Sequence, residues 1–178
     1  MKYLTGIIFI ALIMNTTTIF DFTSNTDLEN WRVVDDVVMG GRSSGTFELS
    51  PEGHGKFKGE ISLENNGGFS SVRYSFSQME VSPDDHIRIR VKGDGKKYQF
   101  RIKHDRRYRY SYLHEFETSG DWQTVDVPLE NMYPVFRGRE LDLPDFDQKS
   151  MEELVFLIGN KKPESFELLI DKIELIQD

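Results

Sequence analysis

The most informative segment of the chain is WRVVDDVVMGGRSSG, residues 31–45. Its valines favour extended structure, whereas the neighbouring carboxylates of Asp35 and Asp36 would repel one another if both were buried, so we expect at least one to face water. Gly40 and Gly41 then permit backbone angles that other residues avoid. The segment therefore predicts a strand, a tight corner and a second strand.

The corner has two interpretations, a structural bend or a binding surface. Glycine pairs serve turns more often than they serve ligands, which favours the bend. As a binding surface, the corner would offer amides, hydroxyls and a carboxylate beside an apolar side chain. Its candidate binding residues are Asp36, Met39, Gly40, Gly41, Ser43 and Ser44. In both interpretations Trp31 is expected to fix the corner to the core.

Short segments of alternating apolar and polar residues, separated by turn signals, occupy most of the remaining chain. In residues 86–92 and 98–103 the alternation is clean, so each segment should have one core face and one wet face. Ser150 is a possible cap for a single helical turn over residues 151–153, ahead of a buried strand at 154–158. Helix signals are otherwise almost absent, which predicts an all-β antiparallel β-sandwich, or jelly roll.

Length and composition narrow the possible functions. The 178 residues suit one domain, for which we predict residues 18–178, with a core large enough to fold without disulfides. The absence of cysteine excludes thiolate catalysis and thiolate metal sites. A formal net charge of −8 argues against nonspecific binding to nucleic acid or to anionic membranes.

Residues 1–17 resemble a secretory signal or an anchor. A lysine precedes an apolar run over residues 6–14, which is too short for an ordinary transmembrane helix and suits a signal peptide, although no alanine-x-alanine cleavage pattern follows. We therefore expect no transmembrane span and export to a periplasm or cell envelope. A cytoplasmic location would follow if this segment were not a signal.

No constellation of residues points to catalysis. The histidines are scattered along the chain as His54, His86, His104 and His114. They lack metal-ligand spacing and a neighbouring nucleophile motif. Adjacent strand residues point to opposite faces, so Asp35 and Asp36 cannot flank one glycosidic bond. We predict a protein that is not an enzyme and that needs no cofactor and no metal.

Cations gather in the second half of the chain. One basic hairpin carries Arg101, Lys103, Arg106, Arg107 and Arg109. A solvated strand face would explain them, but clustered arginines also bind carboxylates and phosphates bidentately. The candidate binding arginines are Arg73, Arg101, Arg109 and Arg137. The last of these belongs to residues 131–148, an irregular stretch long enough to be functional or mobile.

The tyrosines of the same hairpin are equally ambiguous. Tyr108, Tyr110 and Tyr112 alternate with the arginines and share one face of the predicted strand. Under a sheet they would be core residues, which is favoured because each ring has a large apolar area to bury. On a concave surface they could instead stack against sugar rings.

Several segments carry a family resemblance. In chain order they are WRVVDDVVMGGRSSG, GGFSSVR, YQFRIK, DWQTVDVPL, PVFRGR and FELLIDKIEL. Together they resemble the NADH:ubiquinone oxidoreductase (complex I) intermediate-associated proteins, over residues 19–176. The resemblance implies a galactose-binding-like jelly-roll sandwich related to carbohydrate-binding modules. For mitochondrial members it also implies a role as an assembly factor for complex I.

Two functions follow from these expectations. The first is a non-enzymatic module that binds a protein partner during the assembly or stabilisation of a complex, through the corner and the arginine-bearing loops. The alternative is a carbohydrate-binding β-sandwich of the cell envelope, suggested by the implied fold and the tyrosines. Mitochondrial members carry an import segment, whereas this chain begins like a secreted protein, so we expect a bacterial member whose client is undefined.

Overall fold

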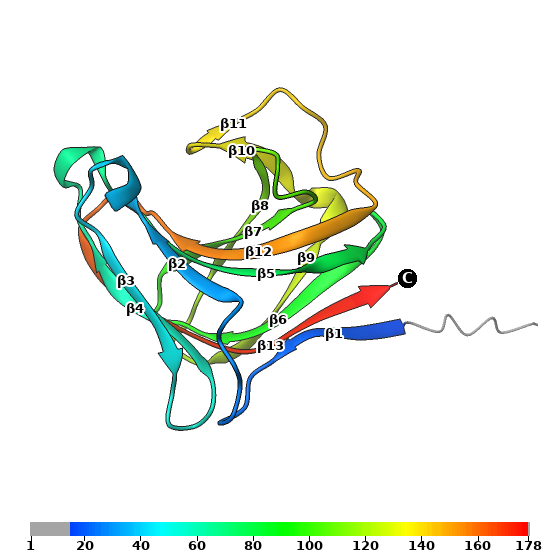
Figure 1. Cartoon of the computed structure of the whole chain (residues 1–178), viewed down its shortest axis with the longest axis horizontal. Coiled ribbons are helices and arrows are strands. Elements are labelled where there is room, and N and C mark those ends of the chain that lie inside the picture. The colour runs from blue at the N-terminus through cyan, green and yellow to red at the C-terminus, as the bar shows by residue number, and fades with distance from the viewer. Residues whose placement is uncertain (1–14, 178) are drawn as a thin grey trace, which may run out of the picture.

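Two antiparallel sheets face one another in the computed structural model, which describes residues 15–177 (Figure 1). The six-stranded sheet has the order β3 (Ser44–Leu49), β4 (Gly55–Ile61), β13 (Glu164–Gln177), β6 (His86–Lys92) and β9 (Trp122–Pro128), with β1 (Asn15–Asp21) also paired to β13. The seven-stranded sheet has the order β11 (Arg139–Glu140), β10 (Tyr133–Phe136), β8 (Ser111–Glu117), β7 (Lys97–Lys103), β12 (Ser150–Ile158), β5 (Ser70–Glu80) and β2 (Trp31–Asp35). The predicted all-β sandwich is confirmed.

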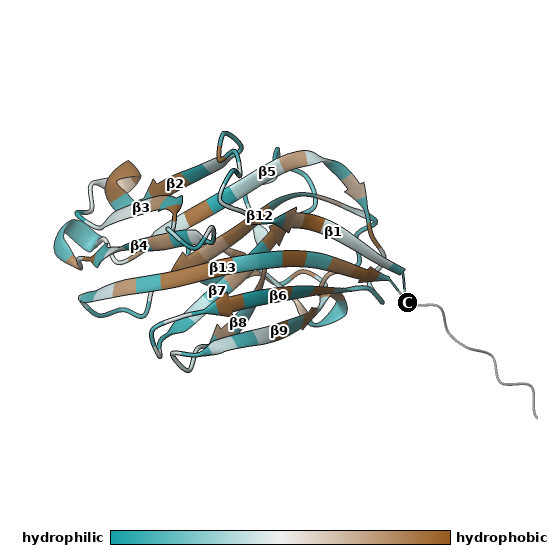
Figure 2. Ribbon diagram, turned by 90° about the horizontal axis from the view of Figure 1, so that it is seen from below, coloured by the Kyte–Doolittle hydropathy of each residue, from teal (hydrophilic) through white to brown (hydrophobic). Residues whose placement is uncertain are grey.

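The core lies between the two sheets and follows the period of two expected for strands. On β7 the side chains of Tyr98, Phe100 and Ile102 are fully buried, while the residues between them point to the outer face. β13 is the longest strand, and Figure 2 shows hydrophobic and hydrophilic residues mixed along it. It pairs with β4 and then β1 on one edge and with β6 on the other, so it joins most of its sheet.

The corner segment crosses from one sheet to the other. β2 belongs to the seven-stranded sheet and β3 to the six-stranded sheet, and the 3-10 turn η1 (Asp36–Met39) lies between them. The predicted order of strand, corner and strand is confirmed. Val37 and Val38 do not extend β2, however, because they form part of η1 and are exposed.

Trp31 fixes this crossing to the core, as expected. Its ring is 7% exposed and contacts Phe20 and Phe47 from the six-stranded sheet and Tyr74 from β5 of the other sheet. The stacked Tyr74 ring lies 4.9 Å away, centroid to centroid. One aromatic side chain therefore ties the start of the corner to both sheets.

Two local expectations for the second half of the chain were wrong. Residues 151–153 form no helical turn but belong to β12, where Met151 is fully buried opposite Met79 of β5. Pairing with β5 at Met151 and Glu153, and with β7 from Glu153 onward, satisfies backbone groups there and outweighs the local capping pattern. Residues 131–148 are not wholly irregular either. They begin at the last residue of η3 (Leu129–Asn131) and contain the hairpin of β10 and β11.

Candidate functional site

The corner is built on a buried carboxylate. Asp36 is completely inaccessible to solvent, and its side chain accepts hydrogen bonds from the amides of Ser43 (2.9 Å), Gly68 (2.6 Å) and Phe69 (3.3 Å), and from the Ser43 hydroxyl. Burial raises the pKa of Asp36, but these donors outweigh burial and hold the pKa below its ordinary value. Asp36 therefore joins η1, the start of β3 and the loop before β5.

The remaining polar residues of the corner divide between its interior and its surface. Ser43 is buried, and its hydroxyl also accepts a hydrogen bond from the Ser62 amide, 3.0 Å away. Asp35 is half-buried and accepts hydrogen bonds from the Gly45 amide and the Ser70 hydroxyl, so it keeps only part of the expected exposure to water. Ser44 is exposed. The side chains of Asp36 and Ser43 cannot meet a ligand unless the corner opens.

The two glycines of the corner serve different purposes. Gly40 ends η1 with φ of 92°, in the left-handed region, and has open space around it. A Cβ atom on Gly41 would instead lie 2.3 Å from Oδ1 of Asp36. Gly40 is needed for its backbone conformation and Gly41 for the close approach of the buried carboxylate.

Replacing Gly41 with alanine is therefore expected to destabilise the fold by about 1–3 kcal/mol, because the new methyl group displaces Asp36 from its hydrogen bonds. Gly40→Asn should cost less than about 1 kcal/mol, since asparagine tolerates the left-handed region. Urea unfolding of both variants would measure the difference. Equal costs at the two positions would show that the contact with Asp36 is unimportant.

Above the buried carboxylate, η1 exposes three successive apolar side chains. Val37 is 61% exposed, Val38 73% and Met39 51%. Because Asp36 holds the base of this turn, the three side chains are presented on a fixed support. We call these three residues the apolar corner.

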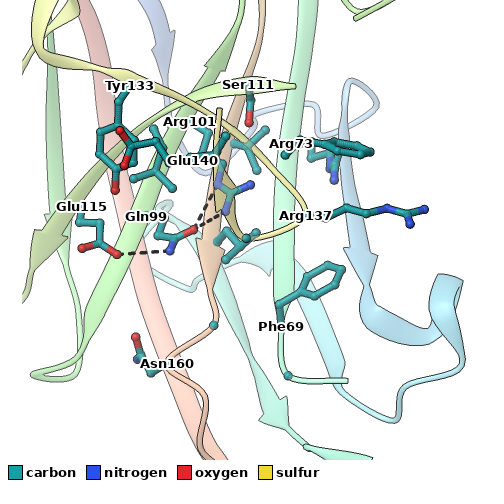
Figure 3. Close-up of a pocket in the computed structure, with 18 of the residues that line it drawn as sticks. Phe69, Arg73, Gln99, Arg101, Ser111, Glu115, Tyr133, Arg137, Glu140 and Asn160 are labelled. Atoms are coloured by element: carbon teal, nitrogen blue, oxygen red, sulfur yellow. Dashed lines mark hydrogen bonds between the residues drawn. The ribbon is translucent and has the colours of Figure 1, made fainter. Parts of the chain in front are cut away.

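A cavity of about 800 Å³ lies beside the apolar corner, on the outer face of the seven-stranded sheet (Figure 3). Its floor comes from alternate residues of β5, β7, β8 and β12, the positions that point away from the core. Its rim comes from Met39, the loop of residues 67–69, the β10–β11 hairpin and residues 159–161. We call this site the cationic cavity, because most of its charged lining residues are cations.

Cations outnumber carboxylates around the cavity. The lining includes Arg73, Lys97, Arg101, Lys103, Arg109, Arg137 and Lys161, against Glu115, Glu140 and Glu153. In a chain whose formal net charge is −8, this places a local positive surface on one face. Clefts lined by one sign of charge concentrate ligands of the opposite sign.

Arg101 lies at the floor of the cavity. Its guanidinium donates from Nε (3.1 Å) and Nη2 (2.5 Å) to the side-chain oxygen of Gln99, whose amide in turn donates to Glu115 (Figure 3). Burial and then the charge of Arg73 lower the pKa of Arg101 to about 10. Gln99 and Glu115 therefore orient this guanidinium without neutralising it directly.

Arg73 is held differently. Glu153, which is 1% exposed, lies 3.6 Å from Nη1 of Arg73 and 3.0 Å from Nη2 of Arg32. Burial lowers the pKa of Arg73, and the nearby carboxylate of Glu153 opposes that effect. The Glu153 carboxylate thus compensates two arginines on the same sheet face.

Four arginines proposed from the sequence come together here. Arg73, Arg101, Arg109 and Arg137 all line the cavity, and Met39 of the corner joins them. Arg137 reaches the rim because Arg137 and Gly138, both with positive φ, form the two-residue turn of the β10–β11 hairpin. The other corner candidates, from Asp36 to Ser44, do not line it.

The remaining members of the basic hairpin point elsewhere. Arg106 pairs with Glu152, and Arg107 pairs with Asp105, both outside the cavity lining. Lys103 lines the cavity and donates to the Tyr108 carbonyl. The basic hairpin is therefore part solvated face and part cavity.

The tyrosines belong mostly to the core. Tyr112 is 2% exposed, Tyr110 is half-buried against the core, and Tyr108 is 50% exposed.

Three residues that line the cavity were not predicted from the sequence: Lys97, Tyr133 and Lys161. The alternation along residues 97–103 could have indicated Lys97, but no local signal marks the other two.

Residues 15–177 also bear on metal binding and membrane insertion. Within them, no group of three or more histidine, cysteine, aspartate or glutamate side chains is arranged to hold a metal ion. No helix in that part of the chain is long and apolar enough to cross a membrane. The predicted signal or anchor segment, residues 1–17, lies outside the described residues except for 15–17, which begin β1.

Solved structures with the same fold include carbohydrate-binding modules. A family 11 module from Clostridium thermocellum, in complex with a β-1,3-1,4-mixed-linked tetrasaccharide, has a TM-score of 0.67 and 16% identity, covering 91% of this chain and 95% of that one. A family 29 module superimposes with a TM-score of 0.56 and 11% identity, over 93% of this chain and 90% of that one. At such identities the likeness establishes the fold, which is the galactose-binding-like sandwich that the resemblance implied.

Sequence relatives are more specific. The complex I intermediate-associated protein 30, mitochondrial, of Drosophila melanogaster is 27% identical, over 71% of this chain and 50% of the fly protein. The mouse protein of the same name (Mus musculus) is 25% identical, over 90% of this chain and 56% of its own length. The chain thus spans about half the length of these relatives.

These relatives correct the predicted location. Both are named mitochondrial proteins, so the expected export to a periplasm or cell envelope is wrong. The prediction relied on one short apolar run after a lysine, and hydropathy of that kind is a property of the segment alone. It carries no information about the compartment in which the β-sandwich works.

The family assignment depends on the β-sandwich instead. A profile of the complex I intermediate-associated protein 30 family matches residues 20–170, from the end of β1 to the middle of β13. This span includes the corner, the cationic cavity and most of both sheets. The chain therefore belongs to the complex I intermediate-associated protein 30 family.

Proposed function

We propose that this chain is a non-catalytic binding module that engages a protein partner during the assembly of complex I. The observation that carries the proposal is family membership combined with a fixed apolar corner beside a cationic cavity. The fly and mouse proteins are named for association with complex I intermediates. The docking face is the outer face of the seven-stranded sheet together with η1.

The apolar corner suits a protein surface better than it suits water. Three successive exposed apolar side chains on a fixed turn form a patch of the kind that marks interaction sites. Met39 belongs both to this patch and to the rim of the cavity. A partner that covers the corner therefore reaches the cavity as well.

A carbohydrate ligand has weaker support. The solved modules of this fold include one bound to a tetrasaccharide, but sequence identity to it is only 16%. Tyr112 is committed to the core and Tyr110 is half-buried, which leaves Tyr108 as the exposed ring of the row. Adducts to glycans in a crosslinking experiment would be the sign of carbohydrate binding.

Photocrosslinking in the native cells tests the proposal. With benzoylphenylalanine in place of Val38, we expect a covalent adduct to a subunit or an assembly intermediate of complex I. The same residue at Thr124, which is exposed on the six-stranded sheet, should give no such adduct. Equal labelling from both sites, or adducts to glycans alone, would reject the proposed docking face.

The variant Val38→Asp tests whether the apolar corner contributes to partner binding. A charge on the apolar corner should reduce co-purification of the crosslinked partner at least about tenfold, because desolvating a carboxylate is costly. Thr124→Asp should leave co-purification unchanged. Circular dichroism of both variants would check that the fold is retained.

A further inference from the structure

Arg101, at the floor of the cavity, has no direct counter-ion in the part of the chain that the structure describes. Among residues 15–177, Arg32, Arg73, Arg106 and Arg107 each have a carboxylate oxygen within 4.0 Å. Arg101 has none in that part of the chain, and its hydrogen bonds to the Gln99 side chain use Nε and Nη2 only. Within the same residues, Nη1 and one N–H of Nη2 make no hydrogen bond, so they are available to a ligand in the cavity that Arg101 lines.

The surroundings of Arg101 make this arrangement costly. Arg101 is only partly exposed, and Arg73 and Lys103 line the same floor. Burial lowers the pKa of Lys103 as well, with further lowering from the charges of Arg73 and Arg32 and an opposing effect from Glu153. Neighbouring cations that are partly buried are stabilised when an anion binds between them.

The geometry of Arg101 favours a planar anion. A guanidinium offers parallel N–H donors that match a carboxylate bidentately, which a point charge such as ammonium does not. Gln99, held by Glu115, restricts the rotation of the Arg101 side chain. Less conformational freedom is then lost when an anion binds.

We propose that the cationic cavity is a carboxylate-binding subsite, in which Arg101 receives an aspartate or glutamate side chain of the partner's docking segment. This inference rests on the proposed function, because it assumes a protein partner at this face. A cavity of about 800 Å³ has room for more than one side chain, and Met39 connects it to the apolar corner. The segment therefore carries an acidic residue for Arg101 and a nearby apolar residue for the corner.

Charge complementarity supports a peptide bearing this pair. The chain has a formal net charge of −8, so an acidic segment is repelled by the protein as a whole and attracted to the cavity. Arg109 and Arg137, both exposed at the rim, guide the segment toward Arg101. A purely apolar segment would cover the corner and leave Arg101 uncompensated.

A random peptide library displayed on phage tests the subsite on the full chain. Selection should enrich peptides in which an acidic residue lies close to an apolar residue. Synthetic copies with glutamine or asparagine at the acidic position should bind at least about tenfold more weakly, as expected for a lost charge-assisted hydrogen bond. Enrichment of peptides without acidic residues, or of none, would overturn the proposal.

Matched variants locate the effect. Arg101→Met should weaken binding of the enriched peptides about tenfold or more. Arg101→Lys should weaken it by less, since lysine keeps the charge but lacks the parallel N–H donors of a guanidinium. Arg107→Met is the control, because Arg107 is 89% exposed and pairs with Asp105 away from the cavity. Equal effects of Arg101→Met and Arg107→Met would overturn the subsite. Thermal melts would confirm that each variant folds.

Competition distinguishes a carboxylate from a phosphate. Sodium glutamate and sodium phosphate are compared at equal ionic strength against an enriched peptide on the wild-type chain. Displacement by phosphate but not by glutamate would assign the subsite to a phosphorylated group and overturn the proposal.

Crosslinking at Val38 reports separately on the partner. A captured partner that is indifferent to Arg101→Met rejects the subsite alone, whereas acidic peptides without a cellular adduct reject the assembly role alone.

Discussion

Replacing Asp36 with alanine is expected to lower the free energy of unfolding by about 3–5 kcal/mol. The change removes a buried carboxylate that accepts hydrogen bonds from three backbone amides and one hydroxyl. Each buried donor that loses its partner costs about 1–3 kcal/mol. Asp142→Ala, at an exposed position, should change the stability by less than about 0.5 kcal/mol.

Asp36→Asn separates charge from shape. The two Asp36 oxygens accept hydrogen bonds from different backbone amides. In either orientation of the asparagine side chain, its NH₂ group therefore faces a backbone N–H donor, and we expect a loss of about 2 kcal/mol. Unchanged stability of Asp36→Asn with lost partner binding would contradict the structural role and make Asp36 a contact residue.

The same carboxylate should contribute to acid sensitivity. The pKa of Asp36 is lower in the folded chain than its ordinary value of 3.8, so its contribution to stability is complete above that value and is lost as pH falls through the folded pKa. Urea unfolding between neutral and acidic pH should therefore show a shallower decline for Asp36→Asn than for the wild-type chain. Parallel curves would contradict this linkage.

Replacing Trp31 with alanine is the second large effect that we expect, at about 4 kcal/mol. The indole is buried among aromatic rings of both sheets, with Phe47 and Tyr74 each 4.9 Å away between centroids. Truncation leaves a large cavity and removes several aromatic contacts. The midpoint of thermal unfolding should fall by roughly 8–16 °C.

Trp31→Phe should be much milder. The buried indole Nε1 has no hydrogen-bond partner among residues 15–177, so losing it carries no hydrogen-bond cost and only part of the packing is removed. Trp122→Ala is the matched control, because Trp122 is half-buried beside His54 and Arg90 on the outer face of the six-stranded sheet. Its expected cost is about 1 kcal/mol. Similar losses for the two alanine variants would contradict the central position of Trp31.

Part of the cationic cavity was predictable because strands have a period of two. Once Tyr98, Phe100 and Ile102 are assigned to the core, Arg101 must point outward, and the outward position of Arg73 follows in the same way from Val72. The alternation says which face each side chain occupies. It does not say which strands are neighbours, so the meeting of Arg73 and Arg101 through β12 was not predictable from spacing.

The role of the corner residues shows a different limit. Adjacent carboxylates in a valine-rich run suggested exposure, because repulsion is the only interaction visible locally. The donors that stabilise buried Asp36 include the amides of Gly68 and Phe69, more than thirty residues away in the sequence. Long-range hydrogen bonds thus stabilise a buried Asp36, which its neighbours in the sequence did not indicate, while Asp35 keeps part of the exposure expected for one of the two carboxylates.

By itself, the sequence determined the all-β class, the core faces, the turn at the glycines and the family, because these depend on local periodicity and on motifs in fixed order. Only the tertiary structure decided what residues 31–45 do: β2 and β3 enter different sheets, Asp36 is buried by amides from a distant loop, and Met39 reaches a cavity with Arg101. The physical reason is that burial, charge compensation and cavity shape depend on which strands pair, and pairing is set by the whole sandwich.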